Sequence, residues 1–364
     1  RQNGPASLRD FLADSFALAA QLPAGRHMLN ICQDRYRFTV GLAAGLISDK
    51  ISLQPASQSA ETLRQIQAAS PDVFCLCDSD FDSLDLPRLD FPELDTTDLR
   101  QRVDIPLIPA TRTAVRLYTS GSTGTPVAHD KTWGFIVQSA HAEAERLGIT
   151  GQPHHVVGTV PAQHSYGFES TVLLAMQARA PFWAGKPFYP QDIVAALNAV
   201  PQPRLLVTTP FHLSALLAAG LALPAVNLIL SATAPLSAQL AHDAEAGFAA
   251  PLYEIYGSTE TGQVASRQTT ADLAWKLLPG VRLRQEAEVT FASGGHIERE
   301  IALSDVIEIQ PDGRFLLHGR QADLVNIAGK RTSLAYLNHQ ICAVPGVADA
   351  AFFLPDDSDA ESNT

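Results

Sequence analysis

The sequence predicts an α/β fold: a large N-terminal domain of mostly parallel, helix-covered sheets with an appended β-rich part, then the start of a small α+β domain. Short apolar runs of strand length alternate with helical patterns as far as Gly280, and repeated β-α-β order is typical of parallel sheets covered by helices. Beyond Gly280 strands follow strands, with a turn signature at Pro311-Asp312-Gly313. The 364 residues also exceed one ordinary domain of roughly 100–200 residues, so two or more subdomains are expected.

The elements of the α/β part are expected in a regular order. Ser7-Leu8-Arg9-Asp10 resembles a capping box, so the first helix should begin there. The acidic segment 78–104 contains Pro87 and Pro92 and is interpreted as a loop or excursion. The other predictions are strands at His27–Cys32, Ile51–Leu53, Val73–Cys77, Ala114–Tyr118, Val156–Val160, Leu205–Thr208, Val226–Leu230 and Tyr253–Tyr256, and helices at Tyr36–Ile47, Ala60–Ala69 and Lys131–Leu147.

The C-terminal part is expected to divide into three pieces. Segments Val281–Phe291 and Glu298–Leu317 should form antiparallel strands, which sets a large domain at 1–319 with its α/β part at 1–280 and its β-rich part at 281–319. Residues 320–329 are expected to be a hinge. Residues 330–364 would begin a small domain with a helix at Leu334–Val344 and a strand at Ala348–Leu354. A domain of this size is short for independent folding, so the natural protein is expected to continue.

The net charge and the hydropathy of the chain indicate which classes of partner it does not bind. The chain has 26 Lys and Arg against 38 Asp and Glu, a formal charge of -12, and no basic run, which argues against nucleic acid or an anionic membrane as the main partner. The longest apolar run, Leu213 to Leu230, is interrupted by Gly220, Pro224 and Asn227, whereas a membrane helix needs about 20 apolar residues. No apolar h-region follows the polar start, so a cytoplasmic protein is expected.

The four cysteines predict neither a metal site nor a redox site. Cys75 and Cys77 are two residues apart, so in a strand they point to one face. They lack the Cys-x-x-Cys spacing of zinc and thioredoxin-like sites. Together with Cys32 and Cys342 they are interpreted as buried thiols in a reducing compartment.

The strongest functional signal is a Gly/Ser/Thr-rich loop that follows the expected strand Ala114–Tyr118. It consists of Tyr118-Thr119-Ser120-Gly121-Ser122-Thr123-Gly124-Thr125-Pro126. The glycines permit a tight turn that brings N–H groups toward a ligand, and the hydroxyls add donors, which suits nucleotide phosphates. A polar surface loop has the same composition. No Lys-Ser/Thr pair follows the second glycine, which excludes a P-loop.

A second polar segment follows the expected strand Tyr253–Tyr256, so it can share a sheet edge with the first loop, where open α/β sheets bind ligands. Its sequence is Tyr253-Glu254-Ile255-Tyr256-Gly257-Ser258-Thr259-Glu260-Thr261-Gly262. Glu260 offers the hard oxygen that Mg²⁺ takes alongside phosphate oxygens, and Tyr256 offers a flat face to a base. A helix start with Glu260 near its N-terminus would explain the same residues.

A third group lies in the β-rich part and the expected hinge. It comprises Ser304-Asp305, Gly319-Arg320-Gln321-Ala322-Asp323 and Gly329-Lys330-Arg331. Asp305 can accept hydrogen bonds from ribose hydroxyls, and Arg320 can donate to ribose or phosphate. Taken alone, a surface ion pair next to a hairpin explains these residues better.

In their order and spacing these segments resemble the adenylate-forming superfamily, which includes acyl-CoA synthetases, aryl-acid ligases, adenylation domains of peptide synthetases and firefly luciferase. The resemblance extends over nearly the whole chain. Two further segments fit it. Ser231-Ala232-Thr233-Ala234-Pro235-Leu236-Ser237 looks like the adenine-side loop, and Pro161-Ala162-Gln163-His164-Ser165-Tyr166-Gly167 looks like the segment whose His or aromatic residue borders the carboxylate site.

The resemblance implies ATP and Mg²⁺ as cofactors and gives the matching residues their roles. Thr119, Ser120, Gly121, Ser122, Thr123 and Gly124 would wrap the β- and γ-phosphates. Thr259 would touch the α-phosphate, Glu260 would hold Mg²⁺, and His164 would border the acid. Tyr256, next to Gly257, would stack on adenine beside Ala232, Thr233 and Ala234, while Asp305 and Arg320 would hold the ribose and Asp323 would lie at the hinge.

Two departures from the family pattern stand out. Many relatives have Lys after the Pro of the first loop, where this chain has Val127. The nearest lysine, Lys131, either substitutes for it or simply begins the next helix, and we favour the second interpretation. No segment matches the catalytic Lys that lies near the end of the family's C-terminal domain.

The resemblance implies attack of a substrate carboxylate on the α-phosphorus of ATP, followed by capture of the acyl-AMP by coenzyme A or the pantetheine arm of a carrier protein. A compact aromatic or short acyl acid is preferred to a long fatty acid, because His164, Tyr166, Phe168 and Trp133 are candidates for lining a small pocket. The alternative is a non-catalytic nucleotide-binding module, since the catalytic Lys is not visible. The gene sequence beyond Thr364 distinguishes the two.

Overall fold

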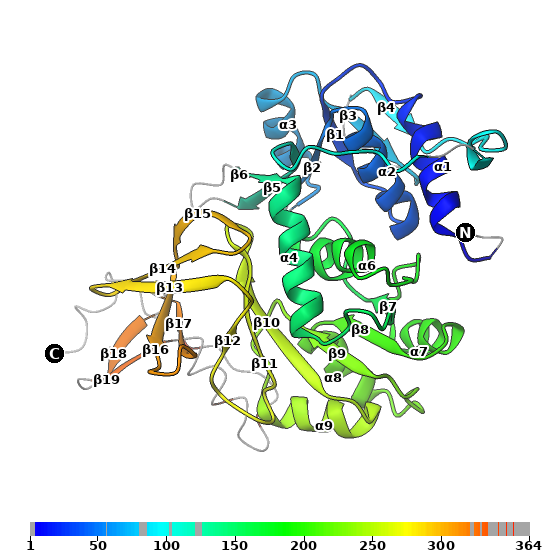
Figure 1. Cartoon of the computed structure of the whole chain (residues 1–364). Helices are drawn as coiled ribbons and strands as arrows, with labels where there is room; N and C mark the ends of the chain where they lie inside the picture. The colour runs from blue at the N-terminus through cyan, green and yellow to red at the C-terminus, as the bar shows by residue number, and fades with distance from the viewer. Residues whose placement is uncertain are drawn as a thin grey trace.

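The computed structural model describes residues 4–55, 57–79, 86–101, 104–120, 126–320, 324–327 and 330–333, together with residues 341, 347 and 352. Figure 1 shows two α/β parts, one above the other, and a β-rich part beside the lower one. The predicted architecture of helix-covered, largely parallel sheets with an appended β-rich part is therefore confirmed.

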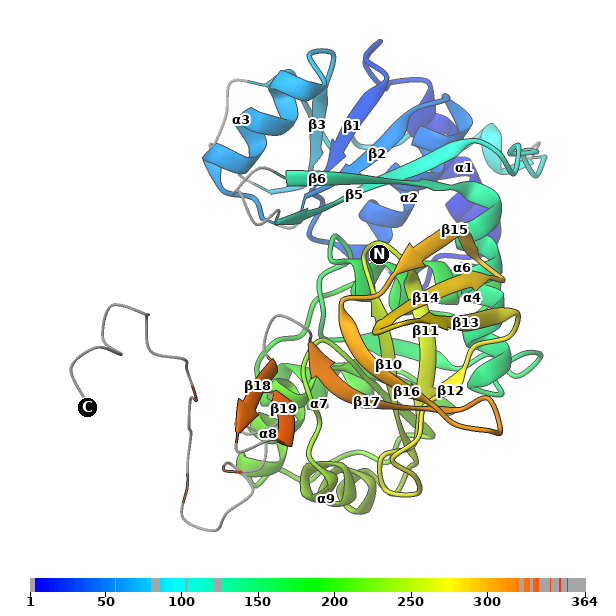
Figure 2. The same ribbon diagram turned by 90° about the vertical axis from the view of Figure 1, so that its left-hand side faces the viewer.

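The upper α/β part is a six-stranded sheet with the strand order β4-β3-β1-β2-β5-β6. Its predicted strands β1 (His27–Asn30), β2 (Ile51–Gln54), β3 (Phe74–Cys77) and β5 (Thr113–Ser120) run parallel. Helices α1 (Leu8–Ala19) and α2 (Arg35–Ile47) cover one face and α3 (Ala60–Ala69) covers the other (Figure 2). Successive side chains of β1 point to opposite faces of the sheet. Met28 packs in the hydrophobic cluster that includes residues of α2, and Leu29 packs in the cluster that includes residues of α3.

The first helix begins at the predicted capping box. Ser7 Oγ accepts from the Asp10 N–H (3.1 Å), and the Asp10 carboxylate accepts from the Ser7 N–H (2.9 Å). Both bonds satisfy N–H groups that the first helical turn leaves without partners.

Three short elements of the upper part differ from the prediction. Strand β4 (Arg88–Asp90) and the 3-10 helix η1 (Leu99–Gln101) lie in the segment interpreted as a loop. Residues Pro126–Thr132 form strand β6, which pairs antiparallel with β5, so helix α4 (Trp133–Arg146) begins after Lys131 and not at it.

The lower part is a second six-stranded sheet with the order β12-β11-β10-β9-β8-β7. The predicted strands β7 (His155–Gly158), β8 (Arg204–Thr208), β9 (Leu228–Ser231) and β10 (Leu252–Ser258) run parallel. Strands β11 (Gly262–Arg267) and β12 (Lys276–Leu277) were not predicted and continue the sheet in antiparallel order. The remaining elements of this part are α5 (Ser165–Gly167), the π-helical η2 (Phe168–Leu173), α6 (Leu174–Gln177), α7 (Pro190–Ala199), α8 (Pro210–Ala218) and α9 (Ala238–Phe248).

The β-rich part contains more turns than the sequence predicted. Strands β13 (Val281–Glu286), β14 (Val289–Gly294) and β15 (Ile297–Ala302) form an antiparallel sheet, and β16 (Asp305–Ile309) pairs with β17 (Phe315–Arg320). The expected hinge 320–329 contains β18 (Leu324–Ile327), which pairs with β19 (Lys330–Ser333). The hinge and the domain boundaries stay predictions. The helix and strand predicted beyond residue 333 lie outside the described residues, except for residues 341 and 352.

Three of the four cysteines lie within the described residues, and all three are buried, as the sequence predicted. Cys32, Cys75 and Cys77 are buried free thiols, and burial raises the pKa of the Cys75 thiol. Cys342 lies outside the described residues. Within the described ranges, no helix is both long and apolar enough to cross a membrane.

Candidate functional site

Strand β6 brings together the two segments that the sequence singled out. His129 Nε2 lies 3.1 Å from Thr119 Oγ1 on β5 and 3.5 Å from Glu260 Oε1 in the turn after β10. Lys131, two residues further along the same strand, donates from Nζ to the Glu260 carbonyl oxygen (2.6 Å). The end of β5 and the β10–β11 turn therefore meet, although more than a hundred residues separate them in the chain.

The second motif is a hairpin turn, so the interpretation of Glu260 as a helix-start residue is wrong. Ser258 pairs with Gly262 across β10 and β11, and Ser258 and Thr261 exchange hydrogen bonds of 3.1 and 3.3 Å. Gly257 is required here, because a Cβ at this position would lie 2.2 Å from the Gly262 carbonyl oxygen. The tight turn leaves the Glu260 side chain 37% exposed.

Glu260 fits the role of a magnesium ligand. Among the described residues no group of three or more His, Cys, Asp or Glu side chains could hold a metal ion. Magnesium is often bound by only one or two carboxylates, with phosphate oxygens and water completing an octahedron. A single partly exposed carboxylate near Thr119, where the predicted phosphate-binding loop begins, is compatible with that requirement, and Glu260 would hold the ion through its oxygens.

The residues predicted to bind adenine and ribose also lie close together. The parallel pairing of β9 with β10 sets Ser231 opposite Glu254, so Ala232–Ala234 and Tyr256 emerge from the same ends of neighbouring strands. Thr233 has φ 82°, an uncommon conformation for a non-glycine residue. Tyr256 Oη donates to Asp305 Oδ2 (2.7 Å), which joins the adenine-side strand to the predicted ribose ligand.

Tyr256 is held by an aromatic cluster. Its ring centroid lies 5.7 Å from that of Trp275 and 5.6 Å from that of Phe315, in tilted and edge-to-face arrangements. Such contacts fix the ring plane at little entropic cost. The phenol that contacts Asp305 is therefore positioned by Trp275, directly before β12, together with Phe315 of the β-rich part.

His164 lies at the start of the short helix Ser165–Gly167 and is exposed. Its Nδ1 accepts from the Tyr166 N–H (3.3 Å), which requires Nδ1 without a proton and leaves Nε2 as a donor. Gly167 allows this tight turn, because a Cβ there would lie 2.0 Å from the Pro161 carbonyl oxygen. The ring can therefore present an N–H to a substrate oxygen.

Buried groups of the upper part hold the His164 segment in place. Gln163 Nε2 donates to the Cys32 carbonyl oxygen (2.5 Å). The fully buried Arg35 donates to the carbonyl oxygens of Gly158 (3.2 Å) and Val160 (2.9 Å), directly before this segment. Its other hydrogen bonds go to Thr171 Oγ1, Trp183 O and Gly185 O. Burial lowers the pKa of Arg35 to about 10, so the guanidinium stays charged at neutral pH.

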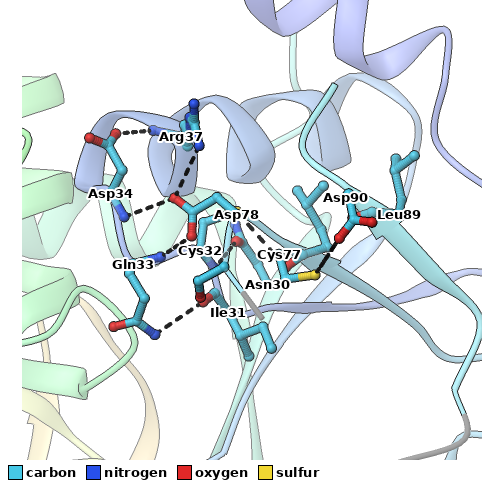
Figure 3. A network of polar contacts seen from close by, with 12 residues as sticks. Asn30, Ile31, Cys32, Gln33, Asp34, Arg37, Cys77, Asp78, Leu89 and Asp90 are labelled. Carbon is cyan, nitrogen blue, oxygen red and sulfur yellow. Dashed lines mark hydrogen bonds and ion pairs between the residues drawn. The ribbon is translucent and has the colours of Figure 1, made fainter. Parts of the chain in front are cut away.

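The loop after β1, which provides the Cys32 carbonyl, is itself fixed by a carboxylate. Figure 3 shows Asp78 accepting from the backbone N–H groups of Gln33 (2.7 Å) and Asp34 (3.0 Å), with Arg37 Nη1 at 3.9 Å. Asp34 in turn accepts from the Arg37 N–H at the start of α2 (2.9 Å). These hydrogen bonds hold the backbone directly after β1, next to the Cys32 carbonyl that Gln163 contacts.

Lys131 was interpreted incorrectly from the sequence. It does not begin the helix, because it lies in β6, two residues before α4, and its ammonium donates to the Glu260 carbonyl in the β10–β11 turn. Burial lowers its pKa, while the nearby carboxylates of Glu169, Glu298 and Glu260 oppose this effect. Sequence reasoning also missed His129 and Arg35. His129 and Lys131 are two residues apart in a strand and therefore point to the same face of the sheet. This spacing is the signal that could have predicted that both contact the β10–β11 turn.

The other predicted site residues are only partly described. Gly121, Ser122, Thr123, Gly124 and Asp323 lie outside the described residues, and only the backbone of Ser120 and Arg320 is described. Thr259 lies in the β10–β11 turn beside Glu260.

A cavity of about 20 Å³ lies behind the β10–β11 turn. Of the four residues expected to line a small pocket for the acid, only Phe168 lines this cavity, and the prediction of that pocket stays a prediction. Tyr166 is buried instead and donates from Oη to the Leu230 carbonyl oxygen (2.9 Å).

Comparisons with known proteins agree with this geometry. Residues 20–290 match the family described as AMP-binding enzyme. The chain is 31% identical over 240 residues to a 4-coumarate–CoA ligase from Rhodobacter capsulatus, covering 66% of this chain and 60% of the relative. It is 28% identical over 262 residues to a ligase of the same name from Halorhodospira halophila, covering 68% and 64%. The chain thus spans about 60% of the length of these curated relatives.

Solved structures show the same fold. ATP-bound MatB from Rhodopseudomonas palustris superimposes with a TM-score of 0.77 at 18% identity, covering 94% of this chain and 79% of MatB. The o-succinylbenzoate CoA synthetase (MenE) of Bacillus subtilis, in complex with its acyl-adenylate, gives 0.75 at 18% identity, covering 94% and 78%.

Proposed function

Because the chain belongs to the AMP-binding enzyme family, we propose that its site activates a carboxylic acid as an acyl-adenylate, using ATP and Mg²⁺, and then transfers the acyl group to a thiol. One observation supports this proposal above all. His129 contacts both Thr119 and Glu260, which brings the phosphate-loop strand and the candidate magnesium ligand into one site.

The residues of the site would act mainly by positioning and by charge stabilisation. Bound Mg²⁺ would neutralise charge on the phosphates, and Glu260 would hold it. Thr259 would donate to the α-phosphate, and the loop that begins at Thr119 would hold the β- and γ-phosphates. His164, with a proton on Nε2, would donate to a carboxylate oxygen and so orient the acid for in-line attack.

The adenosine would be held on the other side of the turn. Tyr256 would pack against adenine beside Ala232–Ala234, and Asp305 would accept from ribose hydroxyls. The bond from Tyr256 Oη to Asp305 Oδ2 supports this arrangement, because it fixes the relative position of the two groups. Arg320 would complete the ribose site.

Coenzyme A is the favoured thiol, and a carrier-protein pantetheine is the other possibility. The names of the curated relatives support coenzyme A. We propose an aromatic or short acyl acid as substrate, and the name of the curated relatives, 4-coumarate–CoA ligase, supports an aromatic acid.

The test is ATP–pyrophosphate exchange by the whole protein against a panel of aromatic, short-chain and long-chain acids. Exchange with aromatic or short acids, followed by acyl transfer to coenzyme A, is the expected result. Exchange with palmitate alone would contradict the choice of acid. ATP binding without exchange for any acid would support a non-catalytic nucleotide-binding module instead.

A further inference from the structure

Glu169 is a buried carboxylate to which the proposed reaction gives no role. It lies in the π-helical turn η2 (Phe168–Leu173), and 8% of the residue is exposed. A buried carboxylate is costly unless it is paired and hydrogen-bonded, and π-helical turns occur frequently at functional sites. The contacts of Glu169 therefore indicate what this turn positions.

Three elements supply polar contacts to this carboxylate. Ser165 Oγ donates to Glu169 Oε1 (2.9 Å). Burial raises the pKa of this carboxyl, and the Lys131 ammonium, the Ser165 hydroxyl and the Gln263 N–H oppose the rise. The carboxylate also faces the β10–β11 turn, because a Cβ on Gly262 would lie 3.4 Å from Oε2 and 3.9 Å from Oε1. Glu169 is thus held between α5, β6 and β11.

These contacts lead to both predicted substrate sites. Ser165 directly follows His164, the residue expected to orient the acid. Lys131 donates from Nζ to the carbonyl oxygen of Glu260, the predicted magnesium ligand (2.6 Å). One buried carboxylate therefore connects the acid side of the site with the ATP and Mg²⁺ side.

Stability alone does not account for this arrangement. Burial lowers the pKa of Lys131 and raises that of Glu169, so both charges are withdrawn from water. A buried ion pair contributes little net stability, because the loss of hydration offsets the attraction between the charges. The position of this pair between the two substrate sites gives it a function that its stability does not.

The His164 segment, residues 161–168, contains backbone amides that report whether it is ordered. The His164 N–H donates to the Pro161 carbonyl oxygen (3.2 Å), and the Phe168 N–H donates to the His164 carbonyl oxygen (2.7 Å). The Tyr166 N–H donates to His164 Nδ1 (3.3 Å). Opening of the segment breaks these bonds, so hydrogen exchange of the amides measures its order.

A ligand that restricts the β10–β11 turn can order this segment without changing its shape. Binding at one site that rigidifies groups shared with a second site lowers the entropic cost of binding there. Glu169 is such a shared group, because it contacts both the turn and the residue next to His164.

We propose that Glu169 is a positioning residue that couples the two substrate sites, so that Mg²⁺ and ATP at the β10–β11 turn order the His164 segment before the acid binds. Lys131 transmits the effect from the turn, and Ser165 transmits it to His164. This inference rests on the proposed function, because it takes the turn as the ATP and Mg²⁺ site. In-line attack benefits directly, since it requires both substrates to be held in one relative orientation.

The test is hydrogen–deuterium exchange of the whole protein with and without Mg²⁺ and ATP, in the absence of any acid, so that no adenylate forms. We expect the ligands to slow exchange at the β10–β11 turn and, by about tenfold, at the amides of residues 164–168. Slower exchange at the turn alone would overturn the inference and leave the proposed function standing. No slowing at the turn would contradict the proposed ATP and Mg²⁺ site itself, and the inference would fall with it.

Two variants break the proposed link at different contacts. Glu169→Gln removes the charge that attracts Lys131, and Ser165→Ala removes the hydrogen bond at the other end. Each should keep the slowing at the turn and reduce that at residues 164–168 to less than about twofold. Glu145→Gln, an exposed site on α4, should keep the wild-type pattern.

Retention of the wild-type slowing at residues 164–168 in either folded variant would mean that ATP orders the segment by direct contact or another route, and would overturn the inference. If Glu169→Gln does not fold, Ser165→Ala decides the question by itself, because it deletes one hydroxyl of a partly exposed residue. A general loss of stability would speed exchange with and without ligand alike, so the ratio of the two rates separates the proposed role from a merely structural one.

Discussion

Replacing Lys131 by Met should weaken both the fold and the exchange reaction, because this lysine anchors the β10–β11 turn. Its Nζ donates to the Glu260 carbonyl oxygen at 2.6 Å, and a hydrogen bond from a charged group contributes about 1.5–3 kcal/mol. The variant also removes the ammonium whose charge lowers the pKa of Glu169. That carboxyl can take up a proton, which limits the additional cost.

These magnitudes give two measurable effects. A loss of about 1.5–3 kcal/mol lowers the melting temperature of a large domain by roughly 2–4 °C per kcal/mol, hence about 3–12 °C. If the same energy holds Glu260 in place during exchange, the rate falls about 10- to 100-fold. Differential scanning calorimetry and ATP–pyrophosphate exchange measure the two quantities.

Lys276→Met is the matched control, because Lys276 is exposed on β12. It should leave both the melting temperature and the exchange rate within error of the wild type. If Lys131→Met behaves like this control in both assays, the role of Lys131 as the anchor of the turn is refuted.

Three further perturbations test other parts of the site. Glu260→Gln should lower pyrophosphate exchange about 100-fold or more and raise the Mg²⁺ concentration that exchange requires, since it removes the hard anionic ligand; an unchanged Mg²⁺ titration would exclude Glu260 as the ligand. Arg35→Met removes the guanidinium donor from five acceptors, of which three are in buried contacts and two in partly buried ones, and should cost at least about 3 kcal/mol in urea unfolding, so a loss below about 1 kcal/mol would contradict its supporting role. Burial raises the pKa of Glu143 from 4.5 to about 8. Between these two pH values the folded state keeps a proton that the unfolded state has released, so the free energy of unfolding falls as the pH rises from about 4.5 to about 8. Relative to Glu143→Gln, wild-type stability should fall by up to about 1.4 kcal/mol per pH unit in urea unfolding at pH 5 to 8, with Glu145→Gln following the wild type; parallel curves for the wild type and Glu143→Gln would refute the assignment.

Much of the fold could be predicted from local sequence patterns. The capping box at Ser7, the short apolar strands and the helices between them are local signals, and each agrees with the element found. The β-α-β order then requires parallel neighbours, which places polar loops at the carboxyl ends of strands. The expectation that the first two polar segments share one sheet edge is wrong, because β5 lies in the upper sheet and β10 in the lower one. The two segments meet instead through His129 and Lys131 of β6, which contact the β10–β11 turn.

Strand β6 could not be predicted in the same way. Residues Pro126–Thr132 contain polar His129, Asp130 and Lys131, and most of their side chains are only partly covered. The segment is a strand because β5 provides a pairing edge, and tertiary pairing of this kind outweighs local propensity. The aromatic residues that follow, beginning at Trp133, made a helix start near Lys131 the simpler interpretation.

The buried carboxyls were missed because charged residues on a helix normally face water. Glu143 and Glu145 look equivalent in the sequence, yet only Glu143 is buried. Its spacing from Ile136 and Ser139 places it on the apolar face of α4, which is the available signal. Contacts such as Lys131 with Glu260 depend on the pairing of distant segments, and no local pattern contains that information.

The central claim is that this site joins a carboxylic acid to AMP. The most direct test is mass spectrometry of a quenched mixture of the whole protein, ATP, Mg²⁺ and each of a panel of hydroxylated and unsubstituted aromatic acids. An acyl-adenylate together with pyrophosphate is the product that the account predicts. Release of ADP and phosphate, or unchanged ATP with every acid, would contradict it.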